Sequence, residues 1–149
     1  MIEKNKMVIR FKSLSENVSF ARVVVGSFAT QLDPDMQQLT DIKTAVSEAV
    51  TNSIIHGYDD ENGDVEITCT LFSDEIQIKI VDFGKGIEDL DMARKPFYSS
   101  CEGDERSGMG FTLMEMFSDK LKVKSKKGVG TTVEIKKSIR KPVMANVDE

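Results

Sequence analysis

The chain has 149 residues, a length that suits a single domain with a substantial buried core. Hydrophobic residues make up 40% and charged residues 30%, and the net charge of -5 argues against a nucleic-acid-binding surface. The sequence shows no signal peptide and no apolar run of the ~20 residues that a membrane span needs. Cys69, Cys101 and the single histidine offer no zinc ligand set. We therefore expect a cytoplasmic protein with neither nucleic acid nor a membrane as partner.

The first part of the chain predicts a strand and a helix. Met7–Lys12 alternates apolar and polar residues, the pattern of a half-buried strand. Ser13 stands three residues before Glu16, and this capping-box pattern predicts a helix that begins there. Apolar residues at helical spacing continue to about Leu32, where we expect the helix to end.

A second helix is predicted after the pair Asp33 and Pro34, because Asp is a good capping residue and Pro suits the first helical position. This helix runs to about His56, and Gly57 fits a C-terminal cap. Six apolar residues at helical spacing form its predicted buried face: Leu39, Ile42, Ala45, Val46, Ala49 and Val50.

Two apolar segments, Val65–Phe72 and Glu75–Val81, predict strands joined by a tight turn. Arg94–Gly108 contains Pro, Gly and several charges without a regular period, which indicates a long loop. Loops of this length in compact domains are commonly functional lids or disordered segments. Helical spacing returns over Met109–Phe117.

The last regular elements, Leu121–Ser125 and Thr131–Lys137, predict a hairpin with a glycine-containing turn. The order of elements predicts an α/β fold, a two-layer α/β sandwich in which helices cover one face of a mixed, mainly antiparallel sheet. We expect one domain over residues 1–137 and a polar C-terminal tail over residues 138–149.

Glu48 and Asn52 are four residues apart on the second predicted helix and so share one of its faces. An amide oxygen is a hard ligand that suits Mg2+, and a carboxylate one turn earlier can accept a proton from an attacking hydroxyl. Taken alone, such a pair is more often a solvated helix edge. Its place beside the apolar stripe favours a position near the boundary of the core.

Asp82 directly follows an apolar strand and precedes Gly84 and Gly86. A carboxylate at a strand end can accept a hydrogen bond from the exocyclic amine of adenine, and glycines let the backbone approach a base closely. Asp and Gly are also ordinary turn residues, so this motif alone is a weak indication.

A second glycine pair, Gly108 and Gly110, precedes the third predicted helix, whose N-terminal N–H groups suit a phosphate. Arg106 lies just before it, and Thr131, at the start of the last strand, is within reach of adenine directly or through water. The alternatives are a hinge, a surface arginine and a strand-forming threonine. We expect His56 to be structural.

Taken in this order, the motifs resemble the GHKL ATPase superfamily, whose nucleotide-binding fold is the Bergerat fold. Within it the chain is similar to the anti-sigma factor serine kinases of Gram-positive bacteria, especially those of sporulation. The segments that carry the resemblance are Ser19–Val23, Gln31–Pro34, Val46–Tyr58 and Glu105–Phe111. Phe83 stands where relatives often carry a polar or acidic residue, but the aspartate and both glycines beside it are intact.

The resemblance implies a role for each motif residue at its matching position. Asn52 would hold the Mg2+ that bridges the ATP phosphates, and Glu48 would be the catalytic base for a protein serine. Asp82 and Thr131 would recognise adenine, and Arg106 would act near the γ-phosphate. The glycines would shape the cofactor pocket and its lid: Gly84, Gly86, Gly108 and Gly110.

The function that the resemblance implies is that of a homodimeric anti-sigma factor and ATP-dependent protein serine kinase. It would sequester a sporulation sigma factor and phosphorylate an anti-anti-sigma factor on serine, with Arg22 contacting both partners. Alternatives are an anti-sigma kinase of the general-stress type and a nucleotide-gated module that binds a sigma factor without transfer. A third alternative is an ATPase that uses water, although its relatives usually carry a transducer domain after the ATP fold.

Overall fold

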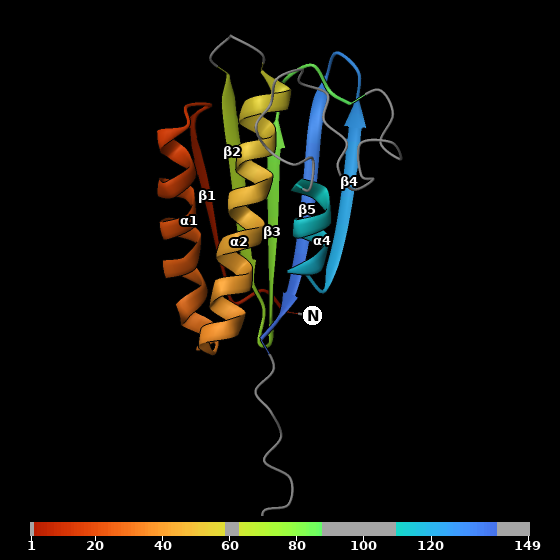
Figure 1. Cartoon of the computed structure of the whole chain (residues 1–149). Coiled ribbons are helices and arrows are strands. Elements are labelled where there is room, and N and C mark those ends of the chain that lie inside the picture. Colours follow the sequence, from red (N-terminus) through yellow and green to blue (C-terminus); the bar gives the residue numbers. More distant parts are fainter. Residues whose placement is uncertain (1, 59–62, 88–109, 140–149) are drawn as a thin grey trace, which may run out of the picture.

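The computed structural model of the protein describes residues 2–58, 63–87 and 110–139 (Figure 1). Strands and helices follow one another along the chain in the predicted order. They are β1 (Asn5–Lys12), α1 (Glu16–Ala29), the 3-10 turn η1 (Thr30–Leu32), α2 (Met36–Asn52), the π-helical turn η2 (Ser53–Gly57), β2 (Asp64–Leu71), β3 (Glu75–Asp82), α4 (Gly110–Met116), β4 (Lys120–Lys126) and β5 (Gly130–Ser138).

The strands form one five-stranded sheet in the order β1-β2-β3-β5-β4. Each neighbouring pair of described strands is antiparallel. Figure 1 shows α1, α2 and α4 side by side over one face of this sheet, and the other face carries no described helix. The predicted two-layer α/β sandwich is confirmed, but the sheet that we expected to be mixed is antiparallel at every described pairing.

The core lies between the helices and the covered face of the sheet. Strand residues alternate across the sheet, so every second side chain of β2 and β3, and Thr131, Val133 and Ile135 of β5, points toward the helices and is buried. The predicted stripe of α2 packs against these side chains, although Leu39 is only partly buried. Each large apolar side chain that is fully buried stabilises the fold by about 1.5–3 kcal/mol. The side chains with less than 2% exposure include Ile42, Ile67, Leu71, Ile76, Ile78, Ile80, Met114 and Ile135.

The predicted start of the first helix is wrong. Helix α1 begins at Glu16 with Ser15 as its capping residue, and no side-chain capping bond is present. The Ser13 hydroxyl instead accepts a hydrogen bond from the Gly63 N–H at 2.9 Å, while the Ser13 N–H donates to the Gly63 carbonyl at 2.9 Å. A tertiary pair of bonds to the start of β2 therefore replaces the local capping box.

The predicted start of the second helix is also wrong. Asp33 has a φ of 55° in the left-handed region, where it ends the 3-10 turn η1 and leaves no helical path through Pro34. Asp35 caps α2 instead: its carboxylate accepts from the Gln38 N–H at 2.7 Å, and the Gln38 side chain accepts from the Asp35 N–H at 2.9 Å. This reciprocal capping box places the cap two residues later than the expected cap at Asp33.

Helix α2 ends at Asn52, and the chain continues into the π-helical turn η2. Single π-helical turns are frequent at functional sites because they redirect side chains at a helix end. The C-cap residues are Ser53 for α2 and Tyr58 for η2, so the predicted C-terminal cap at Gly57 is wrong. The small size of Gly57 serves a close contact with β3 instead.

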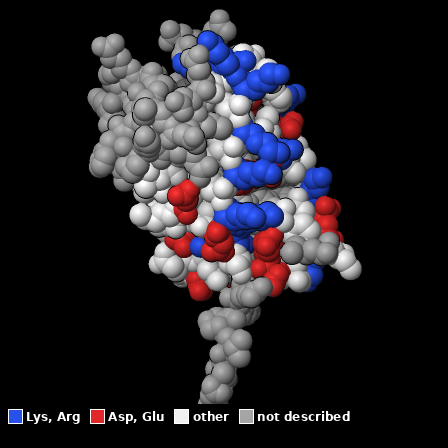
Figure 2. Space-filling model, turned by 90° about the vertical axis from the view of Figure 1, so that its right-hand side faces the viewer, with Lys and Arg blue, Asp and Glu red and all other residues white. Residues whose placement is uncertain are grey.

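Strand β4 forms one edge of the sheet and carries exposed lysines at every second position: Lys120, Lys122, Lys124 and Lys126. Figure 2 shows a line of basic side chains on this side of the molecule. Charged side chains along an edge strand oppose edge-to-edge pairing with another sheet. Among the described residues, no helix is both long and apolar enough to cross a membrane.

Candidate functional site

A group of buried polar side chains lies where β3 ends beside the start of β5. Asp82, the last residue of β3, continues the row of Ile76, Ile78 and Ile80 that faces the helices. Its register partner is Thr131 on β5. Only 3% of Asp82 and 5% of Thr131 is exposed. Burying polar groups in this way is costly unless they are hydrogen-bonded or serve a ligand, so this end of the sheet is the candidate site.

The Asp82 carboxylate is held by three donors. The Gly84 N–H donates to Oδ1 at 3.1 Å, and the Ser53 hydroxyl and the Thr131 backbone N–H also donate to this carboxylate. Burial raises the pKa of Asp82 above its ordinary value, and the three hydrogen bonds oppose this shift without cancelling it. The site therefore keeps a poorly solvated acceptor group in a fixed orientation.

Backbone segments approach each other closely around this carboxylate. A Cβ atom at Gly57 would lie 3.0 Å from both Cγ and Oδ1 of Asp82. A Cβ atom at Gly84 would overlap the carbonyl of Gly57, whose oxygen accepts from the Lys85 N–H at 2.8 Å. Gly86 has a φ of 76°, which favours glycine. The predicted roles of Gly84 and Gly86 in shaping the pocket thus have a steric basis: a side chain at Gly84 would push η2 and the end of β3 apart, and one at Gly86 would overlap the Lys126 carbonyl at the end of β4.

Tyr58 fastens the same segments together. Its hydroxyl donates to the Asp64 carbonyl at 2.7 Å and accepts from the Phe83 N–H at 2.6 Å. Burial is the largest cause that raises the pKa of Tyr58. The exposed Phe83 ring lies under the Arg10 guanidinium, 5.4 Å from its centroid. Phe83 therefore points away from the Asp82 side, which explains why an aromatic residue is compatible with the motif.

A second hydroxyl network adjoins the site on β4 and β5. Ser125 Oγ lies 2.7 Å from the hydroxyl of Thr131 and accepts from the Ile87 N–H at 2.7 Å. Sequence reasoning missed Ser53, Tyr58 and Ser125. The available signal for Ser125 was its place in an inward row of β4 that is otherwise apolar, after Leu121 and Val123.

Helix α2 brings the predicted pair to the same end of the sheet. Asn52 is 8% exposed and directly precedes Ser53, which contacts Asp82. Glu48 lies one turn earlier and is half-buried. The solvated-edge alternative is therefore wrong for Asn52. The neighbouring hydroxyls are used by the helix itself, since Thr51 donates to the Ser47 carbonyl at 2.6 Å.

Several predicted site residues lie outside the described part of the chain. These are Arg106, Gly108 and the loop Arg94–Gly108, and the same holds for Cys101 and the side chain of His56. Gly110 is described as the first residue of α4. Arg22 is exposed on α1.

The donor set fits a cation that needs few protein ligands. In the described ranges, no group of three or more His, Cys, Asp or Glu side chains could hold a metal ion. Mg2+ keeps several waters and is commonly bound by one or two protein oxygens together with substrate phosphates. An amide oxygen of Asn52 is compatible with that mode, whereas a closed structural metal site would need more ligands.

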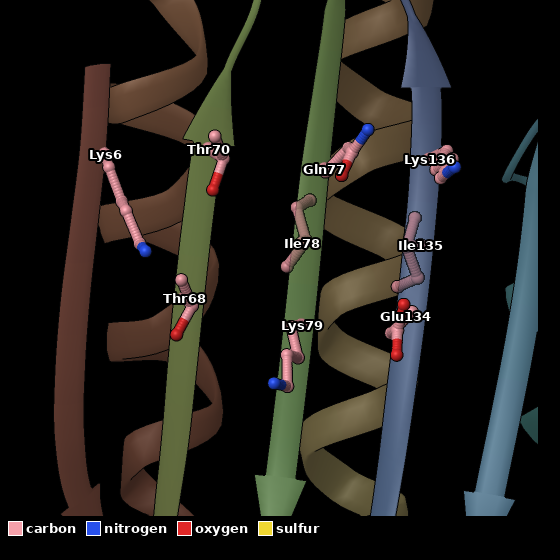
Figure 3. A pocket seen from close by; sticks show the side chains of 9 residues that line it. All are labelled: Lys6, Thr68, Thr70, Gln77, Ile78, Lys79, Glu134, Ile135 and Lys136. Carbon is pink, nitrogen blue, oxygen red and sulfur yellow. The ribbon is translucent and has the colours of Figure 1, made fainter. Parts of the chain in front are cut away.

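The uncovered face of the sheet has a separate shallow hollow of about 270 Å³. Figure 3 shows the side chains that line it, among them Lys6, Thr68, Gln77, Lys79 and Glu134. Side chains of β3 alternate between the two faces of the sheet. Gln77 and Lys79 lie on the face opposite to Ile76, Ile80 and Asp82, so they point away from the helices. This hollow is therefore across the sheet from the Asp82 site.

Comparisons with known proteins identify the family. Residues 11–137 match the family described as histidine kinase-like ATPase domain. The chain is 58% identical over 136 residues to the anti-sigma F factor of Shouchella clausii, covering 91% of this chain and 93% of the relative. The chain belongs to the anti-sigma F factor family. The member from Clostridium novyi is 55% identical over 137 residues, covering 91% of this chain and 96% of its own.

Solved structures share the fold at lower sequence identity. The RsbU and RsbW domains of Rv1364c from Mycobacterium tuberculosis match with a TM-score of 0.65 and 17% identity, over 90% of this chain and 32% of that one. The catalytic domain of histidine kinase ThkA matches with a TM-score of 0.57 and 16% identity, over 89% of this chain and 96% of that one. These likenesses confirm the Bergerat-type fold predicted from the resemblance.

Proposed function

We propose that this protein is an anti-sigma factor and an ATP-dependent protein serine kinase. It sequesters a sporulation sigma factor and phosphorylates an anti-anti-sigma factor on serine. The observation that carries the proposal is the buried Asp82 carboxylate, held by Ser53, Gly84 and Thr131 in a histidine kinase-like ATPase fold. A buried, oriented acceptor at this place is suited to a nucleobase.

Asp82 selects adenine because its carboxylate is a hydrogen-bond acceptor. The carboxylate accepts a hydrogen bond from the exocyclic N6 amine of adenine. Guanine presents a carbonyl oxygen at the same place, and two acceptors facing each other in a poorly solvated site repel. The backbone contacts at Gly57 and Gly84 keep side chains out of the space beside this carboxylate.

The triphosphate extends toward the end of α2 in this proposal. Asn52 supplies an amide oxygen to Mg2+, which when bound neutralises phosphate charge. Gly108 and Gly110 let backbone N–H groups meet the phosphates, and Arg106 contributes positive charge near the γ-phosphate. Gly86 shapes the path that leads from β3 into the lid.

Glu48 is the catalytic base. The acceptor serine oxygen forms a bond to the γ-phosphorus, the bond from that phosphorus to the bridging oxygen breaks, and ADP leaves. Glu48 takes the serine proton. Phosphoryl transfer depends mainly on positioning and electrostatic stabilisation, so α2 contributes by fixing the base relative to the nucleotide.

The exposed side of α1 is the proposed partner surface. Arg22 is flanked by Phe20 and Val23, which are 49% and 60% exposed although both are large and apolar. Exposed apolar side chains beside a cation are typical of protein-binding surfaces. We assign Arg22 to contacts with the sigma factor and the anti-anti-sigma factor. The active form in this proposal is a cytoplasmic homodimer, and the kinase domain of each subunit spans residues 1–137.

Two alternative functions would use the same nucleotide pocket. A nucleotide-gated module binds the sigma factor when ATP is bound but transfers no phosphate, and an anti-sigma kinase of the general-stress type acts on a different sigma factor. The sporulation assignment is favoured because the identities of 58% and 55% are to anti-sigma F factors.

The experiment that tests the proposal follows the label from γ-labelled ATP in the presence of a candidate anti-anti-sigma protein. Magnesium-dependent label on a serine of that protein supports the kinase. Tight ATP binding with no transfer supports the gated module, and release of free phosphate alone supports a water-using ATPase.

A further inference from the structure

The Ser125 hydroxyl lies at the centre of three contacts beside the proposed adenine site. It accepts from the Ile87 N–H at 2.7 Å and lies 2.7 Å from the Thr131 hydroxyl and 3.2 Å from the Gly130 carbonyl oxygen. Ser125 and Thr131 are register partners on neighbouring strands. Ser125 thus joins β4 and β5 to the segment that follows Gly86.

The direction of the protons follows from counting donors. The Ser125 hydroxyl carries one proton, and the Ile87 N–H already occupies one of its two acceptor positions. If Ser125 donates its proton to the Gly130 carbonyl, the contact between the two hydroxyls requires Thr131 to donate its own proton to Ser125. If the Ser125 proton goes to Thr131, the Thr131 proton is free to point elsewhere. The contact to Thr131 has the usual O–H···O length, whereas 3.2 Å to Gly130 is longer than the usual range.

We propose that Ser125 is a positioning residue that donates its proton to the Thr131 hydroxyl, so that Thr131 presents a donor to N1 of adenine, directly or through one water. Adenine has a donor, the N6 amine, next to an acceptor, N1, on one edge. The site offers the complementary pair. The Asp82 carboxylate accepts a hydrogen bond, and the hydroxyl of Thr131, the register partner of Asp82, donates one. This inference rests on the proposed ATP-binding function.

The test compares ATP with its 1-deaza analogue, in which a C–H group replaces N1 and cannot accept a hydrogen bond. Dissociation constants are measured by calorimetry for the wild type, Ser125→Ala, Ser125→Thr, Thr131→Val and the double variant Ser125→Ala/Thr131→Val. A single neutral hydrogen bond contributes about 0.5–1.5 kcal/mol, which corresponds to a roughly 2- to 12-fold change in affinity. Thermal unfolding of each nucleotide-free variant measures the separate cost of losing the acceptor for the Ile87 N–H.

We expect Ser125→Ala to weaken ATP binding about tenfold while changing the affinity for 1-deaza-ATP by less than about twofold. Ser125→Thr, which keeps a hydroxyl, should restore most of the ATP affinity. In the Thr131→Val background, Ser125→Ala should have no further effect on ATP, because the two residues act through one contact.

Equal weakening of ATP and 1-deaza-ATP in Ser125→Ala would overturn the inference, since Ser125 would then act on the pocket as a whole. Unchanged ATP binding in Ser125→Ala would also overturn it. Both results leave the proposed function intact as long as the wild type binds ATP and transfers phosphate. Failure of the wild type to bind ATP would instead refute the proposed function, and this inference with it.

Discussion

The contact between Gly84 and η2 gives the sharpest quantitative prediction about the site. In Gly84→Ala, the new methyl group would overlap the carbonyl of Gly57, and it would lie 2.8 Å from the Gly57 Cα. Because these are backbone atoms, η2 and the end of β3 must separate. Forced overpacking costs about 1–3 kcal/mol, and loss of the Lys85 to Gly57 hydrogen bond adds about 1 kcal/mol.

We therefore expect Gly84→Ala to lower the free energy of unfolding by about 3 kcal/mol, and Tm by about 10 °C for a domain of this size. Urea and thermal unfolding without nucleotide measure both quantities. ATP affinity should fall as well, because the Gly84 N–H orients the Asp82 carboxylate.

Gly128→Ala is the matched control. A Cβ atom at Gly128 meets no atom within 4 Å, so its cost is limited to the strain of a φ of 80°, about 1 kcal/mol. ATP affinity should be unchanged in this variant. Equal destabilisation by the two substitutions, or full ATP affinity in Gly84→Ala, would refute the steric argument.

Three further predictions concern the polar groups of the site. Ser53→Ala removes a donor to the Asp82 carboxylate and should weaken ATP binding about 3- to 10-fold in calorimetry, whereas Ser47→Ala, which removes a hydroxyl bonded within its own helix, should not. Asn52→Ala should weaken binding of magnesium-ATP far more than binding of ATP with a chelator, and an unchanged magnesium dependence would count against Asn52 as a ligand. Because burial raises the pKa of Asp82 in the folded state, nucleotide-free wild type should lose stability relative to Asp82→Asn as the pH rises through that raised pKa. Chemical unfolding over a pH series measures this, and the opposite slope would contradict the assigned shift.

The sequence was sufficient to predict the elements whose signal is periodic. Alternating apolar residues in β2 and β3 and the helical stripe of α2 are properties of single segments, so they do not depend on what packs against them. Asp82 could be singled out because it ends an apolar strand, and Asn52 because it lies one turn after Glu48 beside the apolar stripe of α2.

Features that depend on tertiary contacts could not be predicted. Ser13 has a good local capping pattern, but its hydroxyl accepts from Gly63, 50 residues away. Ser53 and Tyr58 are ordinary in sequence, and their roles come from the π-helical turn that places them against the end of β3. Such networks arise only when separate strands and turns are brought together, so local patterns carry little information about them.

The central claim, that the protein transfers phosphate with Glu48 as base, is tested most directly by comparing Glu48→Gln with the wild type. The measurement is transfer from γ-labelled ATP to an anti-anti-sigma protein, together with ATP affinity by calorimetry for the same preparations. Our account predicts that Glu48→Gln keeps ATP affinity within a few fold and loses at least about 99% of transfer, as removal of a general base commonly does. Parallel loss of binding and transfer, or full transfer by Glu48→Gln, would contradict the account.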